Sequence, residues 1–151
     1  MNLALKKSLY ELCEQYVNKK ITQAQNGIND AQNSANNETK SSAGDKYETG
    51  RAMMHLEKEK YARQLSEAIQ LKGLLTSVPY SKTHESVQSG ALIQTSNGFF
   101  FISISAGKLQ FNGQTYFAMS IASPIALVLR GLKKDETTTF RERTITILNI
   151  I

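Results

Sequence analysis

Apolar side chains recur at alternating intervals of four and three residues in the N-terminal part of the chain, and this spacing is the strongest constraint on its fold. A seam with this period lies along the face of one α-helix that packs against another. No proline interrupts residues 3–38. We therefore predict a long helix from Leu3 to about Glu38. Its seam consists of Val17, Ile21, Ala24, Ile28, Ala31 and Ala35.

A second helical pattern runs from Asp45 to about Ser77 and stops before Pro79. The stretch between the two patterns, residues 38–50, is small, polar and contains glycine, which is typical of a turn between antiparallel helices. The sequence thus predicts an antiparallel helical hairpin, a coiled coil, over residues 1–77. The side chains expected on the inner face of its second helix are Met54, Leu56, Tyr61, Leu65, Ala68, Ile69, Leu71, Leu74 and Leu75.

From residue 89 onward the apolar period becomes two, which is the period of a β-strand. Turn signals at Asn97-Gly98 and Asn112-Gly113 separate the expected strands, and Arg141 to Arg143 form a further turn. Ser123 followed by Pro124 is typical of the start of a helix. Residues 89–151 are therefore expected to form an antiparallel sheet with one short helix, joined to the hairpin by a linker over residues 78–88. The fold class is α+β.

Lysine and arginine outnumber aspartate and glutamate by 18 to 13, so the net charge is +5. A basic protein can bind nucleic acid or an acidic protein surface, although ordinary soluble surfaces carry a similar excess. The single cysteine, Cys13, excludes an intrachain disulfide and is expected to pack in a core. No stretch has the ~20 apolar residues of a membrane span, and no signal peptide is apparent. We expect a cytoplasmic protein with no membrane partner.

The sequence shows no nucleophile–base pair, phosphate-binding loop or cofactor fingerprint, so an independent enzyme is not predicted. His55 and His84 are far apart and lack metal-ligand spacing, and both are expected at the surface. Asp45 and Glu48 open the second helix, where the first can cap the backbone and the second can complement the helix dipole. The nearby Lys40, Lys46 and Arg51 are either solvated charges or contacts for RNA phosphates.

Two motifs resemble those of the Gre transcript-cleavage factors of bacterial transcription. Gly44-Asp45-Lys46-Tyr47-Glu48 matches the family pattern Gly-Asp-x-x-Glu at the expected distance from the N-terminus. Met119 to Gly131 resembles the segment in which a strand of the family runs into Ser-Pro-Ile-Ala. The family has an N-terminal antiparallel coiled coil and a C-terminal FKBP-like domain, so the resemblance covers nearly the whole chain.

The resemblance implies a function. Gre factors bind RNA polymerase beside its secondary channel, and the coiled coil passes down the channel toward the active centre. Their tip acids help to hold a second Mg²⁺ and a water, with which the polymerase cleaves the backtracked 3′ end of its RNA. By resemblance, Asp45 and Glu48 share Mg²⁺ with the polymerase rather than holding a cofactor stably, while Ser123 and Pro124 contact the polymerase.

The tip departs from the family pattern after Glu48. The family commonly continues with a second acid and an aromatic residue, which Thr49 to Ala52 lack, and Ser41 stands where a basic residue is common. A secondary-channel regulator that does not stimulate cleavage is therefore an alternative. A coiled-coil interaction module unrelated to transcription is an alternative from another class.

Overall fold

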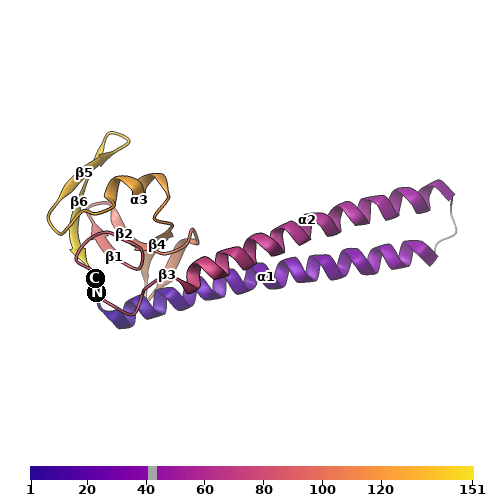
Figure 1. Cartoon of the computed structure of the whole chain (residues 1–151), viewed down its shortest axis with the longest axis horizontal. Helices are drawn as coiled ribbons and strands as arrows, with labels where there is room; N and C mark the ends of the chain where they lie inside the picture. Colours follow the sequence, from indigo (N-terminus) through magenta and orange to yellow (C-terminus); the bar gives the residue numbers. More distant parts are fainter. Residues whose placement is uncertain (41–43) are drawn as a thin grey trace. The chain divides into compact units, whose positions relative to one another are not determined.

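The computed structural model of the chain describes residues 1–40 and 44–151, and it describes side chains outside residues 38–47. Two long helices come first and a six-stranded sheet with a short helix follows, which is the predicted α+β fold class (Figure 1). The elements are α1 Leu3–Lys40, α2 Gly44–Thr76, β1 Leu92–Thr95, β2 Gly98–Ile102, β3 Gly107–Phe111, β4 Gln114–Met119, α3 Pro124–Leu129, β5 Thr137–Phe140 and β6 Arg143–Ile150.

The described chain divides into two compact units. The sheet unit consists of Met1–Tyr16 and Gly73–Ile151, and the hairpin unit consists of Val17–Lys72. The prediction divided the chain into a hairpin over residues 1–77, a linker over 78–88 and a sheet domain over 89–151. In the structure, the first turns of α1 and the expected linker belong to the same compact unit as the sheet. Cys13 is fully buried in this unit, and so is Val87, which belongs to its hydrophobic core.

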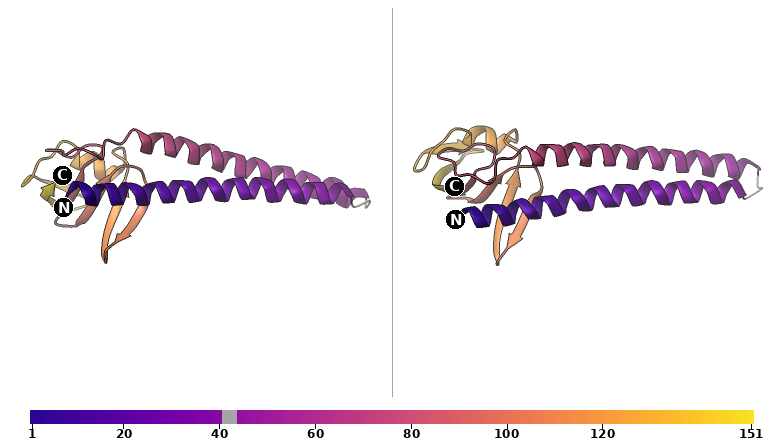
Figure 2. Two further views of the ribbon diagram at one scale, coloured as in Figure 1. Left: turned by 90° about the horizontal axis from the view of Figure 1, so that it is seen from below. Right: turned by 60° about the horizontal axis from the view of Figure 1, so that its bottom comes forward.

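The two helices of the hairpin unit lie side by side and run in opposite directions (Figures 1 and 2). Gly27 of α1 faces the ring of Tyr61 of α2. Further along α1, Gln32 accepts a hydrogen bond of 2.7 Å from Lys58, which precedes Tyr61 in α2. All six residues of the predicted seam are buried or half-buried. The heptad pattern thus correctly identified the face of α1 that is covered.

The inner face of α2 is narrower than predicted. Met54, Tyr61 and Leu65 are half-buried and Ala68 is buried. Other apolar residues of α2 point outward, and the exposed fraction is 66% for Leu56, 54% for Ile69 and 63% for Leu74. The expectation that these three widen the inner face was wrong, because a single partner helix covers only a narrow apolar stripe.

The sheet has the strand order β3-β4-β2-β1-β6-β5. All neighbouring strands are antiparallel except β2 and β4, which pair in parallel from Phe99–Tyr116 to Ile102–Met119. The predicted antiparallel sheet is therefore confirmed except at this pair, which is parallel. The tight turn at Asn112-Gly113 joins β3 to β4 as predicted, but β4 rather than β3 lies next to β2. The returning strand consequently runs in the same direction as β2.

Helix α3 packs on the hydrophobic core through Ala126 and Leu129, both fully buried. Ser123 occupies the predicted position before the helix, in an extended conformation, and Pro124 stands at its start. Gly131 follows the helix with a φ of 82°, which suits a residue without a side chain. Ser123 and Pro124 therefore stand at the beginning of a helix that is packed on the core.

Candidate functional site

The two predicted tip acids lie at the beginning of α2. Because α2 starts at Gly44, Asp45 lies in its first turn and Glu48 lies three residues later, a spacing that places both residues on one side of the helix. The side chain of Glu48 is exposed, and so is that of Arg51. The predicted site residues whose side chains lie outside the described set are Lys40, Asp45 and Lys46.

The described residues contain no cluster of three or more His, Cys, Asp or Glu side chains that could hold a metal ion. A Mg²⁺ ion needs only one or two carboxylates from a protein when waters and substrate oxygens complete its shell. The site predicted at Asp45 and Glu48 is of this open kind. It would require ligands from a partner to hold the ion.

The second predicted site lies at the start of α3. Pro124 is exposed, and the helix also exposes Leu127, at 56%, and Val128. The hydroxyl of Ser123 makes no cap bond; its oxygen is buried and has no hydrogen-bond partner. A buried hydroxyl without a partner costs about 1–3 kcal/mol. Helix α3 therefore exposes apolar side chains, and the residue before it has a buried hydroxyl oxygen without a partner.

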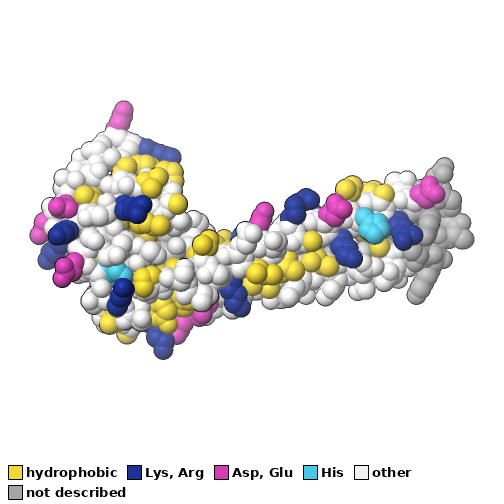
Figure 3. Space-filling view, in the orientation of Figure 1, with side chains coloured by type: hydrophobic (Ala, Val, Ile, Leu, Met, Phe, Trp, Pro, Cys, Tyr) yellow, Lys and Arg dark blue, Asp and Glu magenta, His cyan; other side chains and the backbone are white. Residues whose placement is uncertain are grey.

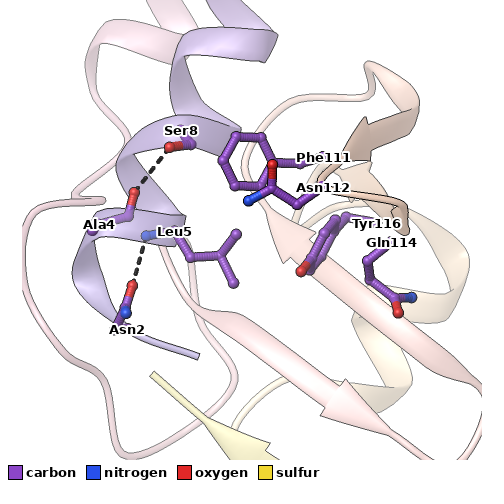
Figure 4. Close-up of a pocket in the computed structure, with 8 residues that line it drawn as sticks. All are labelled: Asn2, Ala4, Leu5, Ser8, Phe111, Asn112, Gln114 and Tyr116. Atoms are coloured by element: carbon purple, nitrogen blue, oxygen red, sulfur yellow. Dashed lines mark hydrogen bonds between the residues drawn. The ribbon is translucent and has the colours of Figure 1, made fainter.

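A cavity of about 370 Å³ lies in the sheet unit between the start of α1 and the β3–β4 hairpin (Figure 4). The side chains of Leu5, Phe111 and Tyr116 face this space. Its polar lining consists of hydroxyl and amide groups and includes no charged side chain. Anion binding and metal binding therefore have no support in this cavity. It is lined by Asn2, Ala4, Leu5, Ser8, Phe111, Asn112, Gln114 and Tyr116.

Sequence reasoning missed a buried lysine in the sheet unit. The ammonium of Lys6 donates hydrogen bonds to the backbone oxygens of Lys82 at 2.7 Å and Ile151 at 3.1 Å. Its third partner is Nδ1 of His84, also at 3.1 Å. Three ammonium hydrogens thus meet three acceptors. Burial lowers the pKa of Lys6 to about 8. No local pattern predicts this site, since Lys6 and His84 are 78 residues apart.

The expectation that His84 lies at the surface was wrong, because it is only 6% exposed, whereas His55 is exposed as predicted. Burial lowers the pKa of His84, and the positive charges of Lys6 and Lys82 lower it further. The neutral ring accepts from Lys6 at Nδ1, which places its proton on Nε2. That nitrogen is buried without a partner. The imidazole therefore acts as an uncharged acceptor for the lysine.

The lowered pKa of Lys6 predicts a protein that becomes more stable in mild alkali. Between pH 8 and the ordinary lysine pKa of 10.5, the unfolded chain binds more protons than the folded chain, so the free energy of unfolding rises with pH. Urea unfolding should show a gain of about 1 kcal/mol from about pH 7.5 to about pH 9. The gain should vanish in Lys6→Met. From about pH 9 to about pH 11 the raised pKa of Cys13 acts in the opposite direction, so the gain from Lys6 is measured below pH 9. A Lys6→Met protein with an unchanged gain would contradict the assignment to Lys6.

Cys13 is a core residue, as predicted. Its sulfur is buried, 3.7 Å from the hydroxyl oxygen of Ser103. Burial raises the pKa of the thiol to about 11. The reactive thiolate is therefore scarce at neutral pH, and Cys13 is unsuited to nucleophilic catalysis.

Among residues 1–40 and 44–151, no helix combines the length and the apolar character required to cross a lipid bilayer. Comparison of the chain with protein-family models, with curated proteins and with solved structures found no match.

Proposed function

We propose that this protein is a Gre-like factor that binds bacterial RNA polymerase at the secondary channel and stimulates cleavage of backtracked RNA. The observation that carries the proposal is the position of the Gly-Asp-x-x-Glu motif. Gly44 is the first residue of α2, so Asp45 and Glu48 immediately follow the connection between two paired helices. A two-helix element is narrow enough to enter a channel, and it carries these acids at its turn.

The proposed chemistry belongs to the polymerase. A second Mg²⁺ in the polymerase active centre would activate a water for attack on the RNA phosphodiester, as in other two-metal sites. Asp45 and Glu48 would add oxygen ligands to that ion or to its waters. Lys40, Lys46 and Arg51 would contact phosphates near the RNA 3′ end. On this proposal the chain assists the cleavage in the cytoplasm and is not an enzyme by itself.

The sheet unit would be the FKBP-like domain that anchors the protein to the polymerase. Ser123 and Pro124 are the residues that match the family's contact segment. The exposed apolar side chains of Leu127 and Val128 lie on the same short helix, and apolar groups that gather on a surface favour protein binding. The exposed side of α3 therefore supports a docking role.

The proposal is tested with stalled, backtracked elongation complexes from the cognate polymerase. The wild-type protein should accelerate RNA shortening, and Asp45→Ala/Glu48→Ala should lose on the order of 10–100-fold of that acceleration, because ligands of the second Mg²⁺ are removed. The matched control is Glu57→Ala/Glu59→Ala, which removes two exposed acids elsewhere on α2 and should retain the acceleration. Polymerase binding is measured in parallel for all three proteins.

A regulator that does not stimulate cleavage is the second candidate. It is favoured by residues 49–52, which lack the second acid and the aromatic residue common in the family. Binding to the polymerase without RNA shortening would select this candidate. A wild-type protein that fails to bind the polymerase would contradict both.

A further inference from the structure

A second cavity of the sheet unit, about 450 Å³ in volume, lies where the β5–β6 turn meets α3. Its apolar lining comes from Ile125 of α3, Phe140 of β5 and Ile145 of β6. Ile145 belongs to the hydrophobic core, and the other two pack against that core from outside. The apolar wall is therefore held in place by the fold. The remaining lining residues are Asn97, Arg141 and Arg143.

The two arginines give this cavity a positive charge. Both are exposed, and neither forms an ion pair with a described acid, including Glu142 between them in the sequence. The guanidinium of Arg141 lies 5.0 Å from the centre of the Phe140 ring, which holds it beside the apolar wall. Figure 3 shows hydrophobic side chains together with Lys or Arg side chains over α3 on the visible face. The cavity thus offers two guanidinium groups next to an apolar surface.

The turn that carries Arg141 has a backbone conformation that is unfavourable for residues with a side chain. Phe140 and Arg143 pair across β5 and β6, which leaves Arg141 and Glu142 as a two-residue turn. Both have positive φ, 49° and 65°. Such turns favour Asn-Gly, because a side chain in this region costs about 1–2 kcal/mol. Strained residues of this kind gather at functional sites. Arg141 thus occupies a position in which asparagine would be less strained.

We propose that this cavity binds a short acidic and partly apolar segment of a partner protein. Its carboxylates would pair with Arg141 and Arg143, since guanidinium groups bind carboxylates through two parallel hydrogen bonds. A neighbouring apolar side chain would pack against Ile125 and Phe140.

The apolar wall favours a peptide over nucleic acid. Nucleic acids are held mainly by a series of cations along their phosphates, with aromatic rings for the bases. The lining of this cavity offers two arginines and one aromatic ring, which is too few cations to follow a series of phosphates. The inference goes beyond the proposed function, because it concerns the chemistry of a bound segment and holds for any partner.

The test uses the full chain with ¹³C-labelled isoleucine methyl groups and two hexapeptides, acetyl-Asp-Leu-Glu-Phe-Asp-Leu-amide and its Asn/Gln counterpart. The acidic peptide should cause saturable shifts of the Ile125 and Ile145 methyl resonances. Arg141→Asn/Arg143→Gln should weaken its binding by tenfold or more, about 1.4 kcal/mol. Glu142→Gly relieves the same turn without removing an arginine, and it should bind as well as the wild type or better.

The double variant is not expected to unfold, since asparagine tolerates positive φ, and its unchanged core methyl spectrum would establish this. Three outcomes would overturn the proposal: no saturable shift with the acidic peptide, equal binding of the amide peptide, or arginine-dependent binding of an oligouridylate that is tighter than that of the peptide. None of these measurements involves polymerase. Their failure is therefore distinguishable from a failure of the tip acids to promote RNA cleavage.

Discussion

Replacing Lys6 with methionine is expected to lower the free energy of unfolding of the sheet unit by about 3 kcal/mol. Methionine has a similar length, so the space is largely filled. The backbone oxygens of Lys82 and Ile151 and the Nδ1 atom of His84 would, however, lose their donor in a buried position. Each unsatisfied buried acceptor costs about 1–3 kcal/mol. The variant no longer has to bury a charged ammonium, and the desolvation cost that it avoids offsets part of this sum.

The neighbouring Lys7 provides the matched control. It is exposed, and its ion pair with Glu11 spans 4.0 Å. Exposed pairs of this kind contribute between 0 and about 1 kcal/mol, so Lys7→Met should leave stability nearly unchanged. Urea denaturation followed by circular dichroism measures both variants. Equal stabilities of the two variants would contradict the role given to Lys6.

Substitution of Gly27 with alanine is expected to destabilise the hairpin unit by about 2 kcal/mol, although alanine is the better helix former by about 1 kcal/mol. A Cβ atom at Gly27 would lie 2.5 Å from ring atoms of Tyr61. The ring atoms nearest to it include Cγ, which cannot move without the rest of the side chain. The two helices would have to separate or Tyr61 would have to leave the seam.

Gly73 is the control, because a Cβ atom there would meet nothing within 4 Å. Gly73→Ala should stabilise the protein by about 0.5–1 kcal/mol. In a double-mutant cycle measured by thermal unfolding, Tyr61→Ala should remove most of the penalty of Gly27→Ala. If both glycine substitutions raise the melting temperature alike, the close approach of Gly27 and Tyr61 does not exist in solution.

The elements could be predicted because their signals are local. The heptad spacing of Val17 to Ala35 depends only on residues three or four positions apart, and it identified the covered face of α1 correctly. The exposure of Leu56 and Ile69 could not be read in the same way. It depends on how many other elements pack around α2, and the spacing of apolar residues within α2 does not reveal that number. The signals that predicted the positions of the strands were likewise local. The parallel pairing of β2 with β4, by contrast, depends on which strands become neighbours after folding.

The candidate sites show the same contrast. Asp45 and Glu48 stand in one short motif, and Ser123 and Pro124 in another, so both could be proposed as sites before the fold was known. The pairing of Lys6 with His84 brings together residues 78 positions apart. The cavity at Arg141 and Arg143 joins a turn to Ile125 of α3. Sites assembled from distant segments leave no spacing in the sequence by which they could be recognised.

The sheet unit is discontinuous along the chain, and this has a consequence for the order in which the protein can be built during translation. Residues 1–16 leave the ribosome before the rest of the unit, and the backbone oxygen of Ile151 that Lys6 binds is made 145 residues after Lys6. The hairpin unit is synthesised between them and needs no later segment for its own pairing. Since domains tend to fold as their residues emerge, the hairpin is expected to pair while the ribosome is still translating. The first turns of α1 can then complete their contacts with the sheet unit only after β6 has been synthesised.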